Sequence, residues 1–206
     1  MNEMMTYSFI KANAFDKMLL AADDARRSCI ELLNPITDAF SVMRTTMVPS
    51  ALQTASFNLR NHNDSVALFE VGRVFIPKAL PLNEDPAELP MLTAVISGKC
   101  GALNWCSRKD SVDFYDMKGI VEGLLAALQV EDYELVRSTE PYLHPGKSCD
   151  IIVKGKVIGS FGEVPSCCSG NFELDLTTYV LECKFCLWLS MQLLFLSIII
   201  CLNIRQ

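Results

Sequence analysis

The sequence has few of the residues on which most catalytic sites depend. It contains only two histidines, and it has neither a Walker-type nor a dinucleotide-binding glycine motif. A run of basic residues is also missing, since 18 Lys and Arg stand against 24 Asp and Glu for a net charge of −6. Binding to nucleic-acid phosphates relies on clustered Lys and Arg. We therefore expect poor nucleic-acid binding by this chain alone, and any contact with RNA would be shared with a partner.

The cysteines lack a paired spacing. There are nine, an odd number, which favours reduced thiols in a cytosolic chain over a secreted disulfide framework. Residues 1–6 show no basic stretch followed by an apolar one, so no signal peptide is expected. Residues 183–186 form a lone CxxC motif, preceded by Cys167 and Cys168. Zinc ribbons usually pair two such motifs, so we assign no metal site, and zinc stays the weaker alternative.

Charged residues are absent from residues 185–204, an apolar stretch flanked by Lys184 and Arg205. A helix of about 20 residues spans about 30 Å, the thickness of a bilayer core. One interpretation is a membrane anchor. The favoured one is an altered reading frame or degraded gene end joined to a truncated soluble domain, where it would promote aggregation. We divide the chain into a domain over residues 1–183 and an apolar tail over residues 184–206.

What the sequence does contain is ample apolar material, because 50% of its residues are hydrophobic. Apolar residues spaced by three and four from Val48 to Leu59 predict a helix with Pro49 in its first turn. A second helix is predicted after Asp116, with Asp113 as the alternative cap, and a brief one after Asn13. Strands are predicted over residues 5–10, 28–33, 66–76, 91–97 and 178–183, with a hairpin over 149–153 and 157–161.

Prolines at positions 77, 81, 86 and 90 predict a loop without regular structure between two of these strands. Hairpins and short strands, with two amphipathic helices inserted between them, are typical of an α+β domain. We expect an antiparallel sheet with the helices on one face.

Six segments, taken in order, carry a resemblance. They are EMMTYSF (3–9), LNPI with SVMRTTMVP (33–36, 41–49), LFEVGRVF (68–75), VDFYDMKG (112–119), LHPGKS (143–148) and IGSFGEV (158–164). Together they resemble the beta subunit of bacterial phenylalanyl-tRNA synthetase. The resemblance covers about residues 3 to 183 and departs after Val164, where Pro165 follows without the family's histidine. The family's tRNA-binding, editing and anticodon-binding domains have no counterpart here.

The resemblance implies a class II aminoacyl-tRNA synthetase-like core without synthetase chemistry. The whole family enzyme is a cytoplasmic α2β2 assembly that joins phenylalanine to its tRNA with ATP and magnesium, and its active site lies in the alpha subunit. This chain would pack against the alpha subunit through its helix faces and proline-rich loop, and would meet tRNA only through the assembled enzyme. We assign it no catalytic or cofactor-binding residue, because the class II Gly-rich segment ending in Arg is absent.

The resemblance marks eleven residues as structural or interface candidates. They are Asn34, Pro35, Arg44, Glu70, Arg73, Asp116, Lys118, His144, Pro145, Gly146 and Glu163. Glu70 lies in an apolar strand, where an unpaired carboxylate is costly. It is either a general base or, as we favour, a buried carboxylate paired with Arg44, Arg73 or backbone N–H groups. Alternation places Glu70 and Arg73 on opposite faces, so their pairing would need a bulge at Gly72.

His144 is either a catalytic or ligand histidine or, as we favour, a loop histidine bonded to backbone. The apolar stretch and the two candidate residues leave two rival functions open. One is a membrane-anchored interaction module held by residues 185–204, with no enzymatic role. The other is a stand-alone hydrolase that uses Glu70 or His144, and it is the least favoured.

Overall fold

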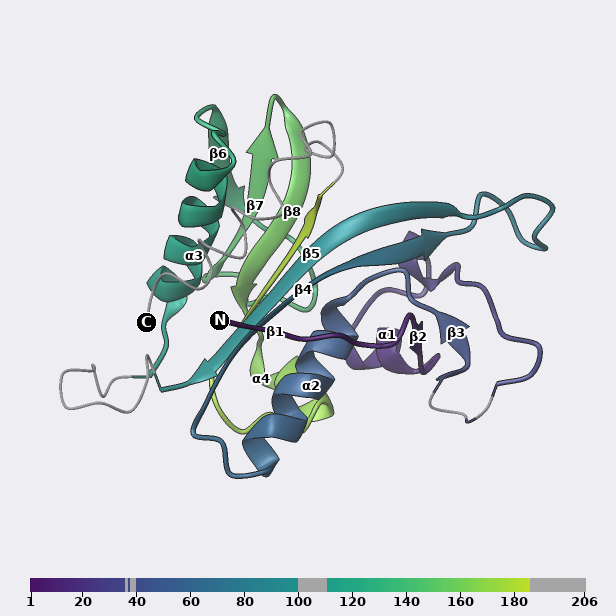
Figure 1. The fold of residues 1–206 in the computed structure, drawn as a ribbon, viewed down its shortest axis with the longest axis horizontal. Helices are drawn as coiled ribbons and strands as arrows, with labels where there is room; N and C mark the ends of the chain where they lie inside the picture. The colour runs from purple at the N-terminus through teal and green to yellow at the C-terminus, as the bar shows by residue number, and fades with distance from the viewer. Residues whose placement is uncertain (36, 38–39, 100–110, 186–206) are drawn as a thin grey trace.

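The computed structural model describes residues 1–35, 37, 40–99 and 111–185, and every structural statement below is confined to them. Helices and strands alternate irregularly along the chain (Figure 1). Their order is β1 (Asn2–Glu3), β2 (Phe9–Ile10), α1 (Ala14–Lys17), the 3-10 helix η1 (Ala25–Arg27), β3 (Val42–Met43), α2 (Val48–Arg60), β4 (Ser65–Ile76), β5 (Ala87–Gly98), α3 (Phe114–Ala127), β6 (Tyr133–Arg137), β7 (Ser148–Val153), β8 (Lys156–Glu163), α4 (Ser166–Asn171) and β9 (Thr178–Lys184).

Seven strands form the main sheet, in the order β1-β4-β5-β9-β8-β7-β6. Every neighbouring pair is antiparallel except β1 and β4, which are parallel. A separate small sheet pairs β2 with β3. The α+β class is therefore confirmed, and the expected antiparallel sheet holds for all but its first short strand.

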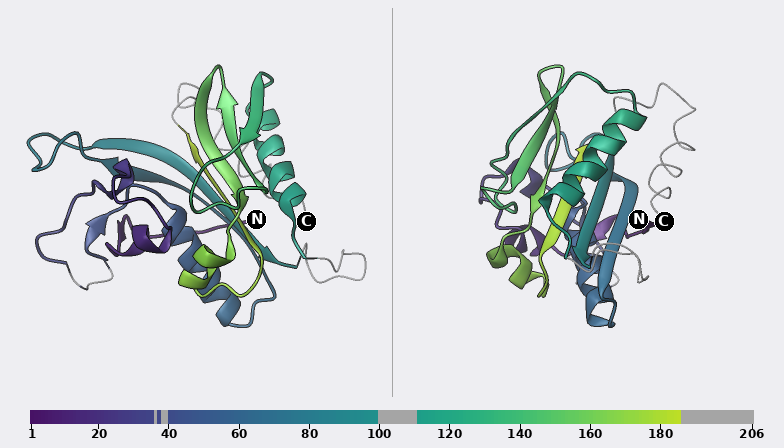
Figure 2. Two further views of the ribbon diagram at one scale, coloured as in Figure 1. Left: turned by 180° about the vertical axis from the view of Figure 1, so that it is seen from behind. Right: turned by 90° about the vertical axis from the view of Figure 1, so that its left-hand side faces the viewer.

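The two long helices cover opposite faces of the sheet (Figures 1 and 2). Val95 of β5 packs in the core beside α2, whereas its neighbours Ala94 and Ile96 pack in the core beside α3. Successive strand residues point to opposite faces, so our expectation that both helices lie on one face was wrong. Residues 91–98 are buried on both sides, and such a strand has no polar face that shows where each helix lies.

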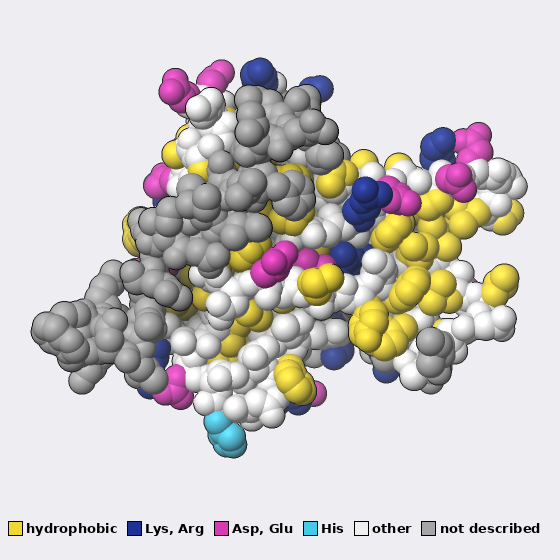
Figure 3. All heavy atoms as spheres, in the orientation of Figure 1, with side chains coloured by type: hydrophobic (Ala, Val, Ile, Leu, Met, Phe, Trp, Pro, Cys, Tyr) yellow, Lys and Arg dark blue, Asp and Glu magenta, His cyan; other side chains and the backbone are white. Residues whose placement is uncertain are grey.

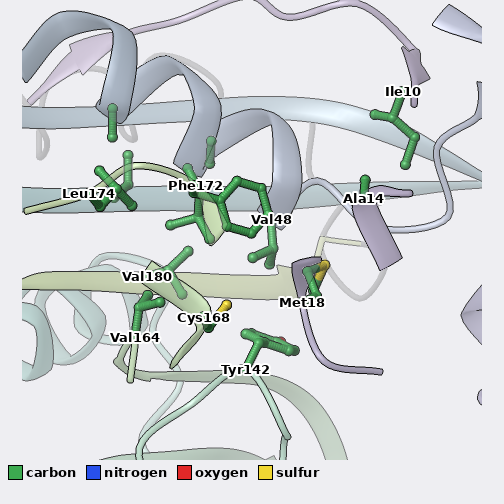
Figure 4. Packing of buried hydrophobic residues seen from close by; sticks show 14 of the residues in the cluster. Ile10, Ala14, Met18, Val48, Tyr142, Val164, Cys168, Phe172, Leu174 and Val180 are labelled. Carbon is green, nitrogen blue, oxygen red and sulfur yellow. The ribbon is translucent and has the colours of Figure 1, made fainter. Parts of the chain in front are cut away.

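The core beside α2 gathers side chains from distant parts of the chain (Figure 4). Its helical side consists of Val48, Ala51, Leu52 and Ala55, the apolar face that the spacing predicted. Met18 and Phe172 approach this face from the N-terminal segment and from the end of α4. The second core lies between the sheet and α3, around Met117 and Val121.

Two expected strands are largely wrong. Residues 28–33 contribute only an isolated bridge between Glu31 and Val42, and the predicted strand over 5–10 is reduced to β2. The chain turns through η1 just before residue 28, because the Asp24 side chain accepts the Arg26 N–H at 2.9 Å. Such a local hydrogen bond competes with strand formation. The signal was present in the sequence, since Asp is a favoured capping residue.

The proline-rich loop is shorter than expected, because β5 already begins at Ala87 and includes Pro90. Pro90 lies opposite Arg73 of β4, and its carbonyl accepts the N–H of Phe185 at 2.9 Å. A proline cannot donate to a sheet ladder, but its carbonyl remains an acceptor. The long β4–β5 hairpin therefore extends outward as an arm (Figure 1).

The predicted helices after Asn13 and Asp113 and the predicted β7–β8 hairpin are confirmed. Helix α3 is capped by the alternative residue Asp113, and Asp116 returns the hydrogen bond in a capping box. The brief helix after Asn13 is present, although the Asn13 side chain makes no capping bond. The hairpin of β7 and β8 turns at Lys154 and Gly155, both of which have positive φ. The sequence analysis did not predict strands β1, β3 and β6, the 3-10 helix η1 or helix α4.

No helix among the described residues is long and apolar enough to cross a membrane. The membrane-anchor hypothesis concerns residues 185–204, and all of these but Phe185 lie outside the described part of the chain. The side chain of Phe185 is buried in the core beside α3.

Candidate functional site

A row of polar side chains crosses the sheet on the face that α2 covers. Glu70 of β4 lies opposite Thr93 of β5, which lies opposite Glu182 of β9. The row continues through Ser160 of β8 to Asp150 of β7. Residues directly opposite each other in neighbouring strands share a face, so these five point to the same side. Buried polar groups need specific hydrogen-bond partners, and this polar row is therefore the candidate site.

Arg44 and Glu70 form a buried ion pair at the β4 end of the row. Arg44 Nη1 lies 3.1 Å from Glu70 Oε1 and 2.9 Å from the Thr6 hydroxyl. Thr6 in turn donates to Glu70 Oε2 at 2.6 Å. Arg44 Nε donates to the carbonyl of Arg73 at 2.8 Å. The structural interpretation of Glu70 as a carboxylate paired with Arg44 is thus confirmed.

Gly72 leaves room for the ion pair of Arg44 and Glu70 and does not form a bulge. The register between β4 and β5 is continuous past Gly72, and Arg73 forms an exposed ion pair with Glu88, so the alternative pairing of Glu70 with Arg73 is wrong. A Cβ at position 72 would overlap Arg44 Nη2 and would lie 2.8 Å from Met47 Cε. Glycine at this position lets the guanidinium lie directly against the strand.

Glu182 occupies the middle of the row and was not singled out from the sequence. Its carboxylate accepts the Met47 N–H at 2.6 Å and the Thr46 hydroxyl at 2.9 Å, at the start of α2. Burial raises the pKa of Glu182, and the Met47 N–H and the Thr46 hydroxyl oppose that shift. The available signal was a single carboxylate within the apolar strand predicted over residues 178–183.

Arg26 carries a second network beside Glu182. Its guanidinium pairs with Asp24 at 2.7 Å and with Glu140 at 2.9 Å, and it lies 5.7 Å from the centre of the Tyr142 ring. Burial, with Glu182 and Glu140 nearby, raises the pKa of the Tyr142 phenol well above its ordinary value. Sequence reasoning also missed this network, because its members come from three separate segments.

His144 organises a tight turn with its neighbours. The ring Nδ1 of His144 accepts the Gly146 N–H at 3.0 Å, and the backbone N–H of His144 donates to the Glu163 carbonyl at 2.7 Å. The Pro145 carbonyl accepts Arg137 Nε at 2.7 Å. The loop-histidine interpretation is confirmed. His144 and Glu70 belong to separate networks, so they do not form a catalytic pair.

The Glu163 carboxylate lies next to this turn. It accepts Lys147 Nζ at 2.6 Å and the Tyr179 hydroxyl at 2.9 Å. Burial alone would raise the pKa of Glu163, but Lys147 and Tyr179 outweigh burial and lower it. The pKa of the Tyr179 phenol is raised, first by burial and second by its hydrogen bond to Glu163.

The remaining candidates are dispersed. Asn34 and Pro35 are exposed, and Lys118 pairs with Glu122 one turn along α3 at 3.5 Å. With Asp116 in the capping box, none of these residues joins the polar row. Their role as interface residues stays a prediction.

The cysteines proposed as the weaker zinc alternative do not converge. Cys168 is buried in the core beside α2 and Cys183 in the core beside α3, so the sheet separates them. Cys186 lies outside the described residues. Within the described ranges, no group of three His, Cys, Asp or Glu side chains is arranged to hold a metal ion.

Residues 1–185 match the protein family described as "Phenylalanyl tRNA synthetase beta chain CLM domain". The chain belongs to this family. The phenylalanine–tRNA ligase beta subunit of Geobacter metallireducens is 37% identical over 185 residues, which are 89% of this chain and 23% of that protein. The corresponding subunit of Syntrophotalea carbinolica is 38% identical over 187 residues, with the same two shares. The chain thus spans about a quarter of the length of these relatives.

The fold has a solved counterpart in pyrrolysyl-tRNA synthetase from Desulfitobacterium hafniense. The TM-score is 0.64 at 16% sequence identity, and the match covers 89% of this chain and 60% of that one. Similarity at this level of identity concerns the fold alone. It supports the class II synthetase-like core that the resemblance implied.

Proposed function

We propose that this chain is a non-catalytic synthetase core that supports the catalytic alpha subunit in ATP-dependent charging of tRNA with phenylalanine. The carrying observation is that both arginines beside the polar row are already paired within the chain. Arg44 holds Glu70, and Arg26 holds Asp24 and Glu140. Synthetase chemistry needs cationic groups that are free to meet the phosphates of ATP.

The residues of the row do not fit ATP or magnesium. With Asp150, Glu182 and Glu140 close together, the face is acidic and would repel a polyphosphate. Glu70 and Glu182 each accept hydrogen bonds from protein donors, which leaves their oxygens engaged. ATP and magnesium therefore belong to the alpha subunit in this proposal, and this chain supplies no catalytic residue.

Exposed apolar side chains supply the contact with the alpha subunit. Met5 is 93% and Leu33 98% exposed, and Leu80 and Leu82 project from the loop between β4 and β5. Figure 3 shows hydrophobic side chains gathered over the outer part of the β4–β5 arm and the adjoining N-terminal region. Large exposed apolar patches mark interaction sites. The assembly is α2β2 and cytoplasmic in this proposal, and tRNA meets the chain only through it.

The division of the chain also belongs to the proposal: the supporting domain comprises residues 1–183, and residues 184–206 are an apolar tail outside it. The folded structure runs slightly past this boundary, since β9 ends at Lys184 and Phe185 is still buried.

Co-expression of the full chain with a tagged bacterial phenylalanyl-tRNA synthetase alpha subunit tests the proposal. We expect the two chains to co-purify and to catalyse phenylalanine-dependent ATP–pyrophosphate exchange. Arg44→Lys removes the guanidinium that contacts both Glu70 and the Arg73 carbonyl but keeps the positive charge, and the exchange rate per complex should not change. A folded chain that does not bind the alpha subunit would contradict the supporting role. Exchange by the chain alone would contradict its non-catalytic nature.

A further inference from the structure

A cavity of about 160 Å³ opens beside the β7–β8 turn, at the end of the sheet that lies away from α2 (Figure 1). Helix α2 packs on β4, β5 and β9, so it does not cover this end. The residues that line the cavity are Asp132, Tyr133, Glu134, Ile152, Lys154 and Gly155. Since liquid water occupies about 30 Å³ per molecule, the space suits a ligand of roughly five non-hydrogen atoms.

The strand register brings side chains of opposite charge to this cavity. Glu134 of β6 lies opposite Ile152 of β7, and Asp132 and Lys154 each lie two residues beyond that pair. Diagonal neighbours in a sheet are about 7–8 Å apart, within reach of long side chains. Even so, the side chains of Asp132, Glu134 and Lys154 form no ion pair or hydrogen bond with any described residue. Two carboxylates and one ammonium group thus border one cavity without pairing across it.

We propose that this cavity binds a small zwitterion, a molecule such as glycine whose ammonium group and carboxylate lie a few bonds apart. The ligand's ammonium group donates to the carboxylates of Asp132 and Glu134, and the Lys154 ammonium group donates to the ligand's carboxylate. The ligand therefore bridges charges that do not reach each other directly. Ile152 is half-buried and offers an apolar contact to the carbon atoms of the ligand.

Other occupants meet the requirements less well. A divalent cation needs several oxygen ligands at short range, and no group of three His, Cys, Asp or Glu side chains in the described ranges is arranged to supply them. A phosphate ion is repelled by the two carboxylates. A ligand with only an ammonium group leaves Lys154 unpaired, and a ligand with only a carboxylate leaves Asp132 and Glu134 unpaired.

Titration of the isotope-labelled full chain with glycine, methylammonium and acetate, followed by two-dimensional NMR, tests the inference. The three charged side chains are exposed, and each exposed ion pair contributes little. We therefore expect saturable glycine binding in the millimolar range, with shifts confined to the amides of residues 132–134 and 152–155. Methylammonium and acetate each lose part of the charge pairing, so they should bind at least about threefold more weakly.

Glu134→Gln and Lys154→Met should each weaken glycine binding by about threefold or more. The matched controls are Glu131→Gln and Lys156→Met, which remove the same charges from exposed neighbours that do not line the cavity. They should change the affinity by less than about 1.5-fold. The inference is overturned if glycine binding does not saturate, if methylammonium or acetate binds equally well, if the shifts lie elsewhere, or if the site variants bind glycine as the controls do.

Discussion

The buried pair of Arg44 and Glu70 lends itself to a direct test of single-residue energetics. Arg44→Met leaves the Glu70 carboxylate buried with only Thr6 as a side-chain donor. Breaking a buried ion pair from one side costs about 3–5 kcal/mol, and we expect a loss of that size in the free energy of unfolding measured with urea. Arg73→Met is the control, since its exposed pair with Glu88 is worth about 0–1 kcal/mol. Equal losses in the two variants would contradict the buried pairing.

Gly72 allows a second test, because the chain contains another glycine in open surroundings. Gly72→Ala places a methyl group against the Arg44 guanidinium and Met47, and such overpacking costs about 1–3 kcal/mol. Gly123→Ala in α3 meets no atom within 4 Å and should stabilise the helix by up to about 1 kcal/mol. The two variants should therefore shift the thermal midpoint in opposite directions. An unchanged or raised midpoint for Gly72→Ala would contradict the close approach of Arg44 and Met47 to this position.

The lowered pKa of Glu163 predicts how stability depends on pH. The folded-state pKa lies below the ordinary value of 4.5, so the carboxylate stabilises the fold above that pH. This contribution falls away as the pH drops through the folded-state pKa. Glu163→Gln cannot ionise, so its stability should change less than that of the unmodified chain between about pH 6 and pH 3. Chemical unfolding at several pH values measures the difference, and parallel curves would exclude this role.

Helix α3 depends at its start on the reciprocal bonds of Asp113 and Asp116. Asp113→Ala removes both the acceptor for the Asp116 N–H and the reciprocal geometry of the cap. Loss of a cap of this kind costs about 1 kcal/mol, and we expect a corresponding drop in unfolding free energy. Lys118→Ala on the same helix breaks only the exposed pair with Glu122, worth about 0.3–0.5 kcal/mol. A smaller effect at Asp113 than at Lys118 would count against the capping box.

The elements that could be predicted are those whose own residues determine them. The apolar spacing of α2 and the Lys154–Gly155 turn are visible over a few neighbouring residues. Strand β5 was placed too late because the partner strand β4 keeps Pro90 in the sheet, which no local pattern indicates. Residues 28–33 have strand-like composition, but the chain before them is held in η1 by Asp24. Tertiary pairing and local capping thus override propensity at these points.

At the scale of the whole molecule, the candidate site was only partly visible in the sequence. Glu70 was noticeable as a charged residue in an apolar predicted strand, and Arg44 as part of a segment that carries the family resemblance. The structure pairs these two residues. Glu182 and Asp150 gained importance only through the strand order, which places β9 between β5 and β8 and aligns the row. A row formed across five strands has no signature along the chain. Its detection requires the register of every pair.

The apolar surface proposed for the alpha subunit predicts a separation of binding from stability. Leu33 is 98% exposed, so Leu33→Asp should change the unfolding free energy by less than about 0.5 kcal/mol. A charge buried in a protein interface costs several kcal/mol, and we expect the complex with the alpha subunit to weaken by at least about tenfold. Titration of the tagged alpha subunit with each variant measures this change.

Val157→Asp provides the matched control, because it introduces the same charge at another exposed apolar position. Val157 is 51% exposed and lies in β8 directly after the β7–β8 turn. Figure 1 shows this turn away from the outer end of the β4–β5 arm. We expect its complex to retain the original affinity. If both variants weaken the complex equally, added negative charge rather than loss of the apolar contact explains the effect. If neither does, the alpha subunit binds elsewhere, and the exposed faces of α2 and α3 become the next surfaces to change.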